Sequence, residues 1–168
     1  MLGLGTKEKI SSALKSNTRN RSFHNLDNMR KVLLLFTYKD WKEVEPIVQD
    51  LRSLRKDVQL WTYQTKKDEV QSLPPSARVI TQKEVFPIVG LSSVVVEEFK
   101  SLSYDTLIDL TTEDDKVLFY LLASNSAEFC IGIKESEHRI FDFSLLREDS
   151  MNLEETYGQI KFYLNNMR

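Results

Sequence analysis

The residues best suited to chemistry lie in one stretch, YDTLIDLTTEDD, at positions 104–115. An apolar run that is typical of a buried strand ends there in two threonines and three acids. Ligands of α/β proteins bind at the carboxyl ends of parallel strands. A buried carboxyl group also needs a partner or has a raised pKa. Asp109, Thr111, Thr112 and Glu113 are therefore the candidate ligand-binding residues.

The same stretch also has a structural interpretation, which stays open. The acids at 113–115 would complement the dipole of a following helix, with Thr111 or Thr112 as its N-cap. Asp109 would then clamp the loop through backbone amides. Acids at that helix start also disfavour a phosphate ligand, which they would repel. An Asp109 that opens onto a pocket favours binding, and one that pairs only with amides favours a structural role.

Other catalytic or cofactor motifs are missing from the sequence. None of the five glycines forms a dinucleotide-binding turn or a phosphate-binding loop, and the first strand runs into the bulky FTYKDW. We therefore expect no cofactor. The single cysteine, Cys130, excludes an internal disulfide, and with two histidines no transition-metal spacing is present. Cys130 lies in an apolar run apart from His138, so a thiol nucleophile with its base is not favoured.

Charge is unevenly distributed along the 168 residues, whose net charge is −2. Residues 1–31 hold seven basic and two acidic side chains, a net +5, so the remainder carries −7. Such a basic segment either packs on the acidic body or binds nucleic acid, an anionic membrane or an acidic partner. The side chains that would meet such a partner are Lys7, Lys9, Lys15, Arg19 and Arg21.

Short apolar runs alternate with segments of helical periodicity. Strands are predicted at 31–38, 58–63 and 104–110, at EFCIGIK, and more weakly at RVIT and RIFDFSLL. Helices are predicted at 6–18, from a start near Glu45 that places Pro46 in the first turn, at 92–103, at 114–125 and at 152–167. KEVFPIVG reads as a loop or an edge segment because of its proline and glycine.

This alternation predicts an α/β fold, a Rossmann-like three-layer sandwich with a mostly parallel sheet of about five strands. A basic N-terminal helix and linker (1–30) would precede a single α/β domain (31–168), which closes with a C-terminal helix. No apolar run is long enough for a transmembrane segment, and the N-terminus lacks the apolar core of a secretory signal. We expect a cytoplasmic protein.

Residues 96–134 resemble the N-terminal domain of heptosyltransferase-like glycosyltransferases of the GT-B type. The shared order is a helix, the strand YDTLIDL, the helix VLFYLLASNSA and the strand EFCIGIK. Only Asp109 matches a motif position. Thr111 and Thr112 stand where those enzymes usually have glycine, and their second, nucleotide-binding domain has no counterpart here. Nearly the whole chain also resembles small bacterial proteins of unknown function with a Rossmann-like layout.

These observations favour a non-enzymatic binding or interaction protein, which could pair as a homodimer. One alternative is a binding site for a sugar or phosphosugar, or a glycosyltransferase-like enzyme, at the strand ends. A second alternative is peripheral binding to nucleic acid or to a membrane surface through the basic N-terminal arm.

Overall fold

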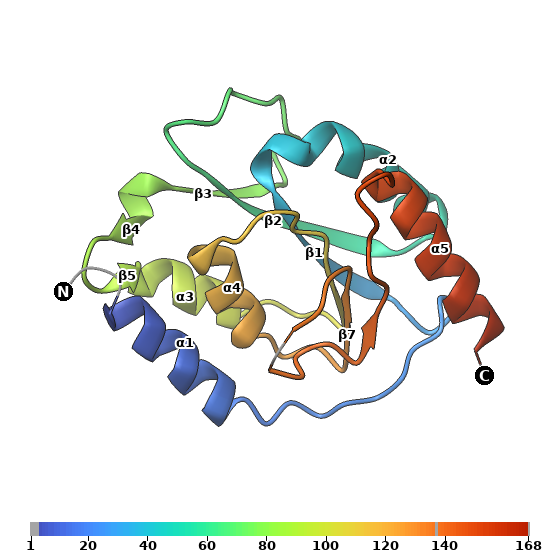
Figure 1. Cartoon of the computed structure of the whole chain (residues 1–168), viewed down its shortest axis with the longest axis horizontal. Coiled ribbons are helices and arrows are strands. Elements are labelled where there is room, and N and C mark those ends of the chain that lie inside the picture. The colour runs from blue at the N-terminus through green and yellow to red at the C-terminus, as the bar shows by residue number, and fades with distance from the viewer. Residues whose placement is uncertain (1–3, 137, 168) are drawn as a thin grey trace.

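The fold is an α/β sandwich, seen in a computed structural model that describes residues 4–136 and 138–167 (Figure 1). Six strands form one sheet in the order β3-β2-β1-β6-β7-β8, and every neighbouring pair is parallel. The strands are β1 (Lys31–Thr37), β2 (Asp57–Gln64), β3 (Arg78–Thr81), β6 (Thr106–Asp109), β7 (Phe129–Gly132) and β8 (Phe143–Ser144). The predicted fold class is confirmed, with one strand more than expected. The sixth strand, the edge strand β8, lies within the weakly predicted RIFDFSLL segment and is only two residues long.

Strand β1 is the centre of the core. Its residues from Val32 to Phe36 are all 0% exposed. Helices cover both faces of the sheet, so successive side chains are buried on opposite sides. This arrangement explains why the apolar run of β1 is continuous and does not alternate with polar residues.

The helices divide between the two faces of the sheet (Figure 1). Helices α2 (Trp41–Ser53) and α5 (Leu153–Asn166) share one core with Val32, Leu34 and Phe36. Helices α3 (Ser93–Lys100) and α4 (Lys116–Ala123) share the other core with Leu33 and Leu35. Helix α1 (Leu4–Ser16) packs against α4. Across residues 4–136 and 138–167, no helix is long and apolar enough to cross a membrane.

Helix α2 corrects one prediction, because it begins at Trp41 and not near Glu45. Pro46 therefore lies inside the helix, where its missing N–H costs one backbone hydrogen bond. The burial of Trp41 and Val44, which are 4% and 0% exposed, explains why the helix begins earlier. Burying each side chain is worth about 1.5–3 kcal/mol, whereas a hydrogen bond contributes about 0.5–1.5 kcal/mol.

The segment KEVFPIVG forms a small antiparallel hairpin beside the main sheet. Strands β4 (Val85–Phe86) and β5 (Gly90–Leu91) pair after the short helix η2 (Gln82–Glu84). Gly90 has a φ of 78°, a conformation that favours glycine. The hairpin is therefore a defined element, where the sequence indicated a loop or an edge segment.

Candidate functional site

The strand order reverses between β1 and β6, which is where doubly wound folds bind dinucleotides. Here the loops that follow these two strands bond to each other. The backbone N–H of Thr112 donates to Thr37 Oγ1 at 3.0 Å, and the Thr112 hydroxyl donates to the Asp40 carboxylate. Lys39 and Glu113 form an ion pair between the same two loops. The chain itself thus closes the position that a cofactor would occupy in a dinucleotide-binding protein.

A cavity of about 220 Å³ lies one strand further along, at the ends of β6 and β7. We call it the acidic cavity. Its apolar wall comes from α4 and from the segment after β7, and consists of Leu118, Phe119, Leu122 and Phe141. Its polar wall consists of Asp109, Thr111, Glu113, Asp114, Asp115, Lys134, Glu135, Ser136 and His138. Of the four candidate site residues, Asp109, Thr111 and Glu113 line this cavity. Thr112 does not, because it bonds to Thr37 and Asp40 of the neighbouring loop.

Asp109 is the most buried charged group of this cavity, at 2% exposed. Its Oδ1 accepts hydrogen bonds from the backbone N–H of Thr111 at 3.0 Å and from the Thr111 hydroxyl at 2.7 Å. Its Oδ2 lies 3.9 Å from Nζ of Lys134, beyond hydrogen-bond distance. Burial raises the pKa of the Asp109 carboxyl group, and the charge of Lys134 and the Thr111 bonds oppose that shift. Asp109 therefore has one oxygen that the loop holds by hydrogen bonds and one that forms only a long ion pair with Lys134 and accepts no hydrogen bond.

Lys134 belongs to the site but was missed from the sequence. Its Nζ donates to Thr111 Oγ1 at 2.6 Å, which orients the hydroxyl toward Asp109. The sequence did contain a feature that could have identified Lys134, because this residue follows the apolar run that forms β7. Parallel pairing places Gly132 of β7 opposite Asp109 of β6, so residues just beyond both strand ends meet at one edge. The sequence alone did not establish that these two strands are neighbours.

The N-cap of α4 is Asp115, and the prediction of Thr111 or Thr112 was wrong. The Asp115 carboxylate accepts hydrogen bonds from the backbone N–H groups of Val117 at 2.8 Å and Leu118 at 3.0 Å. A shorter helix that starts at Lys116 leaves both threonines in the loop before it. Burial raises the pKa of Asp115, and the two backbone bonds oppose that shift. Of the three acids, Asp115 is therefore the N-cap, and Glu113 and Asp114 precede the helix.

Among the described residues, five carboxylates and one lysine line the acidic cavity. The charge of this wall opposes an anionic ligand and attracts a cationic one. In the part of the chain that the structure describes, no group of three or more His, Cys, Asp or Glu side chains is arranged to hold a metal ion. The arrangement therefore suits an organic cation better than a metal or a phosphate.

Cys130 and His138 do not form a catalytic pair. The Cys130 thiol is buried in β7, and desolvation strongly raises its pKa, so it stays protonated and unreactive. His138 is exposed on the wall of the acidic cavity, where its ring meets Phe119 edge-on. The two side chains thus have separate environments, as the sequence suggested.

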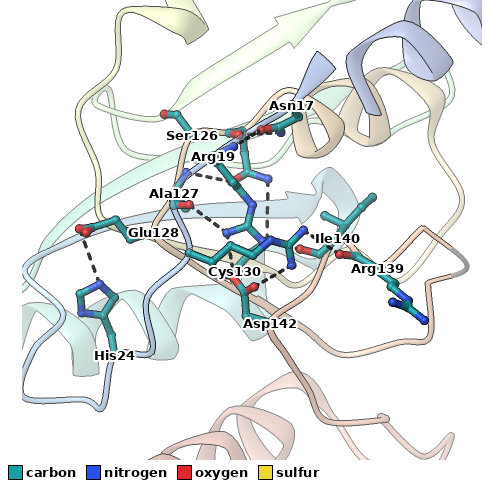
Figure 2. Close-up of polar contacts among 12 residues, drawn as sticks. Asn17, Arg19, His24, Ser126, Ala127, Glu128, Cys130, Arg139, Ile140 and Asp142 are labelled. Carbon is teal, nitrogen blue, oxygen red and sulfur yellow. Dashed lines mark hydrogen bonds and ion pairs between the residues drawn. The ribbon is translucent and has the colours of Figure 1, made fainter. Parts of the chain in front are cut away.

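The basic N-terminal segment packs against the body of the protein (Figure 2). Arg19, whose side chain is 3% exposed, pairs with Asp142 at 2.9 Å. It also donates to the backbone oxygens of Ala127 at 3.0 Å and Ile140 at 2.7 Å. Arg21 donates to the other oxygen of Asp142, also at 2.9 Å. Lys9 also donates to the backbone oxygen of Val89, so three of the five cations that we assigned to an acidic partner are engaged within the chain.

The fold and the acidic cavity define a doubly wound α/β protein with a small cavity at its strand ends and a closed dinucleotide position. The chain belongs to a family of unknown function, DUF6913, whose family model matches residues 5–167. The comparisons found no curated protein and no solved structure that matches this chain. The resemblance of residues 96–134 to glycosyltransferases, and a bacterial origin, stay predictions.

Proposed function

We propose that this protein is a non-enzymatic binding protein that takes a small organic cation, an aliphatic amine or diamine, in the acidic cavity. The observation that carries the proposal is the Oδ2 atom of the buried Asp109, which accepts no hydrogen bond and has only the long ion pair to Lys134, in a cavity lined by five acidic side chains among the described residues. An ammonium group donates three hydrogen bonds and compensates a buried carboxylate. At roughly 30 Å³ for each water-sized group, the cavity accommodates about seven non-hydrogen atoms.

The apolar wall supports a ligand with a carbon chain. Leu118 and Leu122 of α4, with Phe119 and Phe141, would contact its methylene groups. The aromatic rings would also attract a cation that passes over their faces. The wall gives no comparable support for a sugar phosphate, whose charge the acids would repel.

The absence of an activated nucleophile supports binding without catalysis. Among the described residues of the cavity, the side chains are carboxylates, hydroxyls, one lysine and one exposed imidazole. Thr111, the hydroxyl nearest Asp109, already donates to that carboxylate and accepts from Lys134. This closed network orients Asp109 toward a ligand and leaves Thr111 little freedom to attack one.

The N-terminal arm has a supporting role in this proposal. Residues 1–30 precede the α/β domain (31–168), and Arg19 and Arg21 bond the backbone oxygens of Ile140 and Arg139. These two residues lie between His138 and Phe141, which both line the acidic cavity. The arm would therefore hold that wall in place, rather than reach toward nucleic acid or a membrane.

Isothermal titration calorimetry with 1,4-diaminobutane tests the proposal, with succinate and glucose 1-phosphate as anionic comparisons. The diamine should bind, and both anions should not. Asp109→Asn should weaken binding roughly 10- to 150-fold, the value of a hydrogen bond to a charged group. Glu148→Gln, an exposed carboxylate outside the cavity, is the matched control and should leave binding unchanged. Binding of glucose 1-phosphate in preference to the diamine would refute the proposal and favour the phosphosugar alternative.

A further inference from the structure

A second cavity of about 310 Å³ lies on the other side of the α4 N-terminus, and we call it the apolar cavity. It is enclosed by α1, α3, α4 and the β4–β5 hairpin, with side chains from the end of β2 and from η2. Its wall consists of Lys9, Tyr63, Gln82, Val85, Phe86, Pro87, Gly90, Leu91, Val96, Lys116, Val117 and Tyr120. None of these residues lines the acidic cavity.

The wall of this cavity is mainly hydrophobic and aromatic, which is typical of small-molecule sites. Apolar side chains also continue around its mouth. Phe86, Ile88 and Val89 of the hairpin segment are 47%, 59% and 54% exposed. A contiguous apolar surface of this kind marks a place where another apolar group binds.

The charges around the apolar cavity are the reverse of those in the acidic cavity. Among the residues that the structure describes, Lys9 and Lys116 are its two charged lining residues, and no carboxylate lines it. Lys9 donates from α1 to the backbone oxygen of Val89, which joins the helix to the hairpin at the mouth. Lys116 is exposed at the start of α4. An anionic group at the mouth would meet both ammonium groups.

We propose that the apolar cavity binds a free medium-chain carboxylic acid, with its chain inside and its carboxylate at Lys9 and Lys116. At roughly 30 Å³ for each non-hydrogen group, the cavity takes about ten such groups, which is the size of octanoate. The apolar wall selects the chain, and the two lysines select the anionic end. This site does not depend on the acidic cavity or on its ligand.

Calorimetric titration of the full chain with octanoate tests the proposal. Octylamine has the same chain with the opposite charge, and should bind at least about tenfold more weakly. Hexanoate should bind about fifteenfold more weakly than octanoate, because each methylene removed costs about fourfold in affinity. Equal binding of octanoate and octylamine would overturn the role of the lysines, and no binding of octanoate would overturn the site.

Matched variants locate the binding. Val96→Trp fills the cavity from α3 and should abolish octanoate binding, whereas Val94→Trp, on the same helix but 74% exposed and outside the cavity, should not. Lys116→Gln should weaken binding about tenfold, and Lys83→Gln, an exposed lysine outside the wall, should have no effect. Circular dichroism checks that each variant is folded. Asp109→Asn should leave octanoate binding unchanged, which separates this inference from the proposed function.

Discussion

Replacing Arg19 with alanine tests how the N-terminal arm is attached. The guanidinium group has three acceptors, the Asp142 carboxylate and the backbone oxygens of Ala127 and Ile140. The Arg19 side chain is only 3% exposed, so its removal leaves these buried acceptors without their partner. We therefore expect a large loss of stability from a residue outside the sheet.

The magnitude follows from the burial of the pair. Removing one partner of a buried ion pair costs about 3–5 kcal/mol, since the other charge stays behind. Asp142 keeps Arg21 and the backbone N–H of Cys130 at 2.8 Å, so the loss lies at the lower end, about 3 kcal/mol. For a chain of 168 residues, this corresponds to a decrease in Tm of about 6–12 °C.

Arg21→Ala is the matched control, because Arg21 binds the same carboxylate with a side chain that is 51% exposed. An exposed ion pair is worth about 0–1 kcal/mol, so Tm should fall by less than about 4 °C. Urea denaturation followed by circular dichroism measures both variants, with the slope m expected to stay constant. Equal losses for the two arginines would refute the argument that burial decides the energy of this pair.

Four further outcomes are expected. Asp109→Asn should not lower Tm at pH 7. Because burial raises the pKa of Asp109, this carboxyl group keeps its proton to higher pH in the folded wild type than in the unfolded chain. The stability of the wild type relative to the variant should therefore fall as pH rises above the ordinary pKa of an aspartate. Thermal melts from pH 4 to 7 that showed the reverse would contradict this. Gly132→Ala should cost about 1–3 kcal/mol, since its Cβ would lie 2.5 Å from the Phe141 ring, and a second change, Phe141→Leu, should restore part of that loss if the clash is the cause. Asp115→Ala should cost about 1 kcal/mol in chemical denaturation through loss of the α4 cap, and no measurable loss would exclude the capping role. Cys130 should react with a thiol reagent only as the protein unfolds, so fast modification of the folded protein would disprove its burial.

The sequence predicted the layered fold because its periodicities are strong. Val32 to Phe36 form an uninterrupted apolar run, and the structure buries all five. The helix start near Pro46 was misplaced because local backbone preference favoured a later start, while the burial of Trp41 depends on contacts with the sheet that no local pattern contains. The two-residue strand β8 is too short to have a periodicity of its own.

The candidate site was predicted in part for the same reason. Asp109 was identified because a charged residue inside an apolar strand is unusual, and it does line a cavity. Thr112 was grouped with it by position, but its hydroxyl bonds Asp40, 72 residues earlier in the chain. Lys134 was missed because its place beside Asp109 depends on which strands are neighbours in the sheet.

The attachment of the arm also affects the order of events during synthesis. Arg19 leaves the ribosome early, yet its acceptor on Ile140 lies 121 residues later in the chain. At about 5–20 residues per second, the arm waits on the order of 6–24 seconds before its binding surface exists. The bonds that hold Arg19 to Asp142 and Ile140 therefore form only after β7 and the segment that follows it have been made. The Arg19 end of the arm is therefore among the last parts of the molecule to be fixed in place.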